Sequence, residues 1–117
     1  MNFQQITTNR LTQIDVSEWD SDAEAFVKDL TALERLVFND HFLTFYDKEK
    51  SAGERFRAGF KAAQIAIVNK NGDPIIKDED EAAASRASLD PILRVFTHYL
   101  KNDDRADGEP LETTKKN

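Results

Sequence analysis

The chain has 117 residues and a net charge of −6, and 39% of its residues are apolar. This length fits one domain, and the absence of cysteine excludes disulfide scaffolds, thiolate metal sites and thiol catalysis. No apolar run approaches the roughly 18 residues that a membrane-spanning helix needs, and the acidic balance disfavours nucleic-acid binding. The first residues lack the pattern of a secretory signal. We therefore expect a cytoplasmic protein with neither nucleic acid nor membrane as a partner.

The first predicted element is a small N-terminal β-hairpin over residues 13–30. Ile14 and Val16 alternate with polar residues, which is the pattern of a half-buried strand. An Asp-Ser-Asp cluster at residues 20–22 favours a turn, and a second apolar stretch follows it as the returning strand. The alternative is an irregular segment in which Trp19 packs into the core.

The next predicted element is a helix over residues 31–46, which begins with a capping box formed by Thr31 and Glu34. At 100° per residue, its apolar side chains fall on two nearly opposite faces. The aliphatic face consists of Leu33, Leu36, Val37 and Leu43, and the aromatic face consists of Phe38, Phe42, Phe45 and Tyr46. Two interpretations remain open. Either both faces are covered within the domain, or the aromatic face binds another chain.

Three further helices are predicted over residues 54–70, 78–86 and 91–102. The residues after them, 103–117, are rich in charge and are expected to form a flexible tail. The predicted fold class is therefore mainly α. Residues 1–102 form a single globular domain, a compact bundle of about four helices with the small hairpin in front.

Two of these helices carry a clear core stripe. The stripe residues are Phe56, Phe60, Ala63 and Ile67 in the first of the three helices, and Ile92, Val95, Phe96 and Tyr99 in the last. Gly59, Ala62 and Ala66 lie together on one flank and are small enough to let another backbone approach closely. Gly72 is expected to take the left-handed conformation where the chain leaves the helix.

No residue pattern indicates catalysis, a metal or a cofactor. The two histidines, His41 and His98, do not form a metal-binding motif. The acidic run at residues 78–81 is explained by a helix start, where carboxylates favour the positive end of the helix dipole. No glycine-rich phosphate loop or nucleophile elbow occurs. We therefore expect a protein that is not an enzyme and has no cofactor.

Several motifs follow one another in a characteristic order between residues 13 and 102. A strand closes on Glu18-Trp19-Asp20, and a helix begins with the pattern L-[ST]-x-x-E-R at residues 30–35. An alanine-rich helix then runs into the segment 66–76, before an acidic segment and a final helix. This order resembles the tail assembly chaperones of long, flexible-tailed (siphovirus-type) bacteriophages and prophages.

The resemblance implies a scaffold function in the host bacterial cytoplasm. Such proteins bind and solubilise the phage tape-measure protein, self-associate along it, and are absent from the mature virion. A longer form made by ribosomal frameshifting recruits the tail tube protein, and the codons of Lys115 and Lys116 are a candidate site for such a frameshift. Under this interpretation, the aromatic face is the candidate protein-binding site for the client or for self-association.

The main alternative is a small acidic regulatory or inhibitor protein that mimics DNA and acts on a nucleic-acid-binding partner. It requires buried aromatic residues and a continuous strip of exposed carboxylates. The candidate carboxylates are Asp15, Glu18, Asp20, Asp22 and Glu24. A third interpretation is an enzyme whose site forms only with a partner subunit.

Overall fold

The computed structural model describes the backbone of residues 10–107 and the side chains of residues 10–101. In chain order, the elements are β1 (Leu11–Ile14), β2 (Ala25–Lys28), α1 (Ala32–Phe45), α2 (Ala52–Ala66), β3 (Ile67–Val68), the 3-10 turn η2 (Asp78–Asp80), α3 (Glu81–Ser85) and α4 (Asp90–Asp107). The predicted fold class, mainly α with a small β element near the N-terminus, is confirmed.

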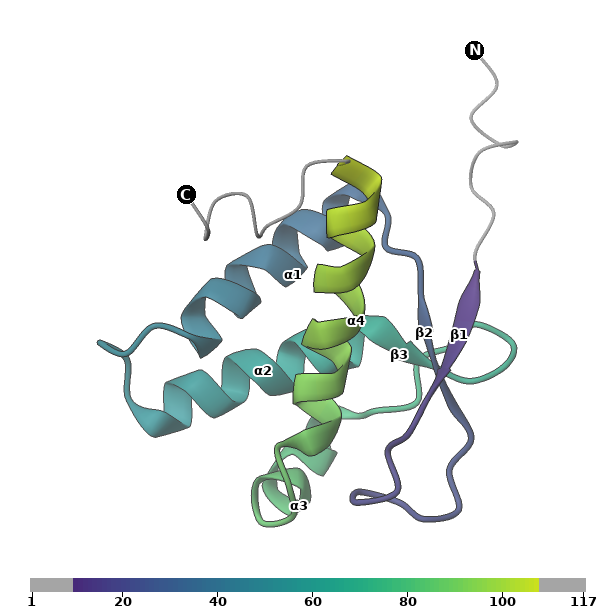
Figure 1. Cartoon of the computed structure of the whole chain (residues 1–117). Coiled ribbons are helices and arrows are strands. Elements are labelled where there is room, and N and C mark those ends of the chain that lie inside the picture. Colours follow the sequence, from purple (N-terminus) through teal and green to yellow (C-terminus); the bar gives the residue numbers. More distant parts are fainter. Residues whose placement is uncertain (1–9, 108–117) are drawn as a thin grey trace.

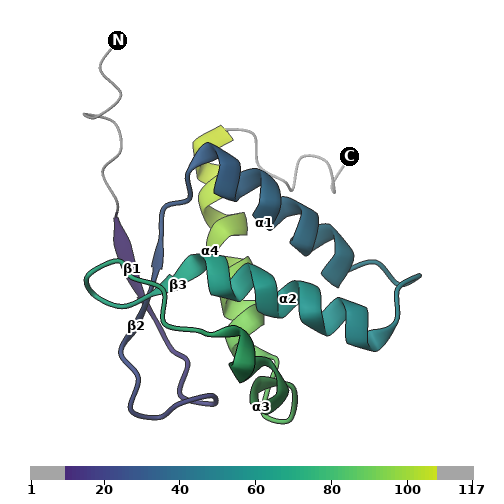
Figure 2. The ribbon, with the colours of Figure 1, turned by 180° about the vertical axis from the view of Figure 1, so that it is seen from behind.

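The helices form two crossed layers (Figure 1). Helices α1 and α2 run side by side in opposite directions, and α4 crosses over the pair. From behind, α1 and α2 lie in front of α4, and the strands lie beside one end of the helices (Figure 2). The core therefore forms where α1, α2, α4 and the sheet meet.

The sheet has three antiparallel strands in the order β1-β2-β3. The pairing of Leu11 with Lys28 and of Ile14 with Ala25 confirms the predicted hairpin, but its strands lie within residues 11–28 rather than 13–30, and Val16 lies in the loop between them. The third strand was not predicted, because Ile67 and Val68 were assigned to the helix over residues 54–70. That assignment is wrong at its C-terminal end. Ile67 has extended backbone angles (φ −92°, ψ 126°) and pairs with β2, a conformation that suits β-branched side chains.

Two helix ends also differ from the prediction. Helix α2 begins at Ala52 rather than at residue 54, because Ser51 and Glu54 form a capping box in which the Ser51 hydroxyl accepts from the Glu54 amide at 3.1 Å. Helix α4 continues to Asp107, past the predicted end at residue 102. The sequence has neither proline nor glycine between Pro91 and residue 107, so no backbone feature ends the helix earlier. The rest of the predicted tail, residues 108–117, lies outside the described residues.

The predicted helix over residues 78–86 is divided into η2 and α3. Its acidic residues face basic residues of α2. Arg57 forms an ion pair with Glu81 at 3.1 Å, and Lys61 forms one with Asp78 at 3.4 Å. These contacts hold the short helical segment against α2. The turn before it contains Gly72, whose φ of +87° confirms the predicted left-handed conformation. This turn follows β3, so Gly72 does not end the helix as predicted.

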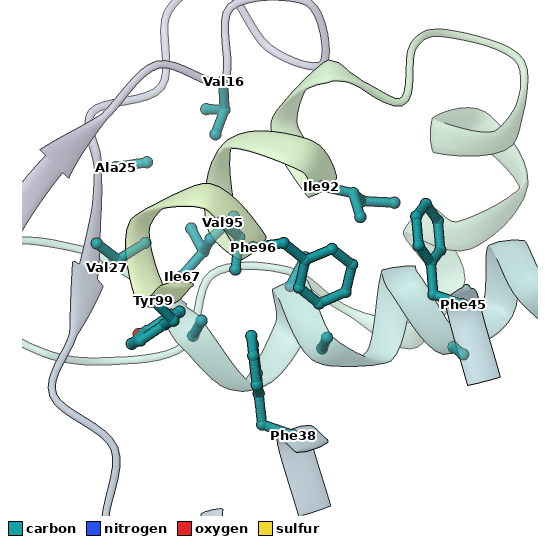
Figure 3. Close-up of a cluster of buried hydrophobic side chains, with 14 residues drawn as sticks. Val16, Ala25, Val27, Phe38, Phe45, Ile67, Ile92, Val95, Phe96 and Tyr99 are labelled. Carbon is teal, nitrogen blue, oxygen red and sulfur yellow. The ribbon is translucent and has the colours of Figure 1, made fainter. Parts of the chain in front are cut away.

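The buried side chains come from both predicted core stripes (Figure 3). Phe56 is only partly buried, and the remaining stripe residues are buried: Phe60, Ala63, Ile67, Ile92, Val95, Phe96 and Tyr99. Val27 of β2 joins this cluster from the sheet side. The prediction of these core residues is confirmed.

Candidate functional site: the two faces of helix α1

The aromatic face of α1 points into the domain. Phe38 and Phe45 are only 3% and 6% exposed, Phe42 is partly buried, and Tyr46 is 48% exposed. All four rings surround Phe96 of α4, with centroid distances between 5.0 and 5.9 Å. The four residues predicted as a protein-binding site therefore form the packing surface between α1 and α4. The interpretation that both faces are covered within the domain is wrong for the aliphatic face, and the aromatic face is covered only in part, since Tyr46 remains exposed.

Small residues of α2 make room for these rings. A β-carbon placed on Gly59 would lie 2.7 Å from Cδ1 of Phe45, which is closer than real contacts allow. Ala62 and Ala63 on the same helix are fully buried. The close approach to Gly59 is thus made by the ring of Phe45 and not, as predicted, by another backbone. This ring lies near Ile92 in Figure 3.

Polar contacts at both ends fix the orientation of α1. At its start, the Thr31 hydroxyl accepts from the Glu34 amide at 3.1 Å, and the Glu34 carboxylate accepts from the Thr31 amide at 3.0 Å. Lys28 of β2 donates to the same carboxylate at 2.7 Å. Partial burial opposes ionisation of Glu34, but the hydrogen bonds from Lys28 and Thr31 outweigh it and lower the pKa. At the other end, Nε of Arg55 donates to the carbonyl of Phe45 at 2.8 Å.

The aliphatic face of α1 points away from the domain. Leu33, Leu36 and Leu43 are 71%, 65% and 66% exposed, and Val37 is also exposed. Their spacing places them on one stripe along the helix. Within the described part of the chain, none of these four side chains belongs to the buried core or to the partly buried residues packed against it. Isolated exposed leucines are common on protein surfaces, but a contiguous exposed stripe is typical of an interaction surface.

An apolar groove continues this surface toward α4. The groove has a volume of about 280 Å³ and lies between Leu43 on α1 and the exposed side chain of Leu100 on α4. The rings of Phe42 and Phe96 also line it. The aliphatic face and this groove together form an apolar surface that a second helix can cover.

His41 lies on the side of α1, beside the core. Partial burial lowers the pKa of its imidazole, the Asp40 carboxylate opposes this change, and the Lys61 ammonium adds to it. The pKa of this side chain is therefore below its ordinary value. His98 lies on α4, where its ring packs edge-on against Tyr99.

The five acidic residues of the predicted cluster are all exposed, but the Glu18 carboxylate is paired with a cation. Arg94 of α4 binds both carboxylate oxygens of Glu18 at 2.6 Å and the Asp15 carbonyl at 2.8 Å. The hydrogen bonds from Arg94 lower the pKa of Glu18. Asp15 and Asp20 accept from backbone amides of their own loop. This loop is fixed further by Trp19, whose indole donates to the Ser88 carbonyl at 2.8 Å.

Over residues 10–101, whose side chains are described, no group of three or more His, Asp or Glu side chains is arranged to hold a metal ion. None of the helices between residues 10 and 107 is long and apolar enough to span a membrane.

Comparisons with protein-family models, curated proteins and solved structures found no match for this chain. The functional argument therefore depends on the site itself. The aliphatic and aromatic faces differ in burial, and the helical spacing of apolar residues in the sequence does not show which face is buried. Sequence analysis identified both faces of α1 but selected the inward one as the binding site.

Proposed function

We propose that the protein is a tail assembly chaperone of the siphovirus type, which binds and solubilises the tape-measure protein during tail morphogenesis. The observation that supports this proposal is the exposed aliphatic face of α1, which is held outward because the opposite face packs around Phe96. A chaperone of a long helical client needs such an apolar surface on a well-folded domain.

Binding would follow the mode in which an amphipathic helix places its apolar residues on a complementary surface. The client helix would lie along Leu33, Leu36 and Leu43, and its side chains would enter the groove beside Leu100. A long client with repeated apolar stripes offers many equivalent sites, so many copies of the chaperone would coat one tape measure. Self-association along the client would then use other surfaces of the domain.

The charge of the chain agrees with this function. A net charge of −6 keeps copies with an exposed apolar stripe from associating before they meet the client. The remaining parts of the proposal are action in the host cytoplasm, absence from the mature virion and recruitment of the tail tube protein by an extended form.

The test is co-expression with the tape-measure protein encoded beside this gene, followed by size-exclusion chromatography with light scattering. The wild-type chain should give a soluble complex with many copies per tape measure. The double variant Leu36→Asp, Leu43→Asp should fold but leave the tape measure insoluble. Leu89→Asp is the matched control, because Leu89 is an exposed leucine that lies outside α1, and it should behave as the wild type.

Two results would contradict the proposal. If the wild-type chain eluted alone beside an insoluble tape measure, the acidic-regulator interpretation would take precedence. The burial of Phe38 and Phe45 supports that interpretation, whereas the ion pair between Glu18 and Arg94 opposes it. If the double variant solubilised the tape measure as well as the wild type, the client would bind elsewhere.

A further inference from the structure

One charged residue lies within the aliphatic face. Asp40 follows Leu36 and Val37 by four and three positions and precedes Leu43 by three, so these side chains are its neighbours on the helix surface. The Asp40 side chain is exposed. The apolar surface of α1 thus contains a carboxylate near its middle rather than only at its rim.

This carboxylate lacks an ion-pair partner in the described part of the chain. The Asp40 side chain makes neither a hydrogen bond nor an ion pair with residues 10–101 and interacts electrostatically with the adjacent His41, whereas Glu34 on the inner side of α1 is bound by Lys28. A partner that covers the aliphatic face would remove the Asp40 carboxylate from water. Burying an unpaired charge is costly, so a stable complex requires a cation opposite it.

We infer that the aliphatic face of α1 selects amphipathic helices that carry a lysine or arginine beside their apolar stripe, and that Asp40 is the residue that recognises this cation. The inference rests on the proposed function in taking a helix as the partner, and it adds the charge that the helix must carry. Arginine suits the position best, since it pairs with a carboxylate through two hydrogen bonds.

A second copy of the chain is a poor occupant of the same face. Two α1 helices paired across a twofold axis would cross near the middle of α1, and Asp40 lies close to that point. The two carboxylates would then face each other within an apolar interface. Like charges in that arrangement oppose association. The charge of the face therefore favours a basic partner over self-association through α1.

The test uses two synthetic amphipathic helices of about 20 residues, long enough to form helix on binding. They share one leucine stripe and differ only in a residue beside it, which is lysine in one peptide and glutamate in the other. Fluorescence anisotropy gives their affinities for the full chain and for two variants. Asp40→Lys reverses the charge of the face, and Asp22→Lys makes the same charge change at an exposed residue of the β1–β2 loop.

The wild-type chain should bind the lysine peptide about fivefold more tightly than the glutamate peptide, and added salt should reduce the difference. Asp40→Lys should reverse the preference, and Asp22→Lys should keep it. Circular dichroism checks that both variants are folded.

The inference is overturned if the wild type binds neither peptide, if it binds both equally, or if Asp40→Lys keeps the original preference. It is also overturned if sedimentation shows a dimer that Leu36→Asp dissociates. A soluble tape-measure complex without any charge preference would remove only the role of Asp40. Charge preference without tape-measure solubilisation would leave Asp40 in place and remove the proposed client.

Discussion

The two faces of α1 have similar apolar content and opposite environments. Phe38 and Phe45 lie in the core, whereas Leu36 and Leu43 are about two-thirds exposed. The difference comes from the elements that face the helix. α2 presents small residues and α4 presents Phe96 to the aromatic side, and the described residues place nothing against the aliphatic side. Partners on other elements therefore determine which of the two apolar stripes becomes core.

The largest expected difference between the two faces is in the loss of unfolding free energy when one side chain on each face is truncated to alanine. Phe38→Ala should lower the free energy of unfolding by about 3–5 kcal/mol, because it removes a buried ring that packs against Phe96 and Tyr99. Leu36→Ala, on the exposed face, should change it by no more than about 0.5 kcal/mol. Urea denaturation followed by circular dichroism measures both values. Equal losses at Phe38 and Leu36 would show that the aliphatic face is covered as well.

Adding a methyl group to a glycine of α2 should have a smaller effect on the free energy of unfolding, and this effect should depend on whether the glycine faces the aromatic side of α1. Gly59→Ala should destabilise the fold by about 1–3 kcal/mol, because the new β-carbon would overlap the ring of Phe45. Gly53→Ala is the matched control in the same helix. No atom outside its immediate neighbours lies within 4 Å of a β-carbon placed there, so it should stabilise α2 by about 0.4–1 kcal/mol. Thermal unfolding of the two variants should shift in opposite directions, and a shared direction would contradict the packing of Phe45 against Gly59.

The smallest expected effect concerns the hydroxyl of Tyr99, whose ring packs against Phe38. This hydroxyl donates to the Lys28 carbonyl, so Tyr99→Phe should cost about 1 kcal/mol. The control Tyr46→Phe, at a half-exposed ring on the rim of the aromatic face, should leave the free energy of unfolding unchanged.

The Tyr99 hydroxyl should also make the stability of the fold depend on pH in the alkaline range. Burial, followed by the charges of Asp29 and Glu34, raises the pKa of Tyr99 above its ordinary value. The unfolded chain therefore loses this proton near pH 10, whereas the folded chain keeps it to higher pH. The contribution of Tyr99 to stability is complete below about pH 10 and is lost as the pH rises through the folded pKa. Unfolding titrations of Tyr99→Phe should show a shallower alkaline loss than the wild type, and an identical loss would show that Tyr99 is not protected.

Local patterns predicted much of the fold. The capping box of Thr31 and Glu34, the left-handed Gly72 and the core stripe around Phe96 depend on residues close together in the chain, and all three are confirmed. Ile67 shows where this approach fails. A buried Ile67 fits the apolar pattern of a helix and that of a strand equally well. The spacing of apolar residues therefore could not show that the backbone becomes extended at Ile67 and pairs with β2.

For the candidate site too, the sequence determined one part and the tertiary structure another. Sequence alone determined that residues 31–46 form a helix with an aliphatic and an aromatic face, because helical geometry fixes which side chains share a face. Only the tertiary structure decided that the aromatic face turns inward. That choice depends on Gly59 and Phe96, which are distant in sequence and meet the helix only in the folded chain. Burying the rings of Phe38 and Phe45 beside Phe96 removes more apolar surface from water than burying two aliphatic side chains would, and the aliphatic face is therefore the one left exposed.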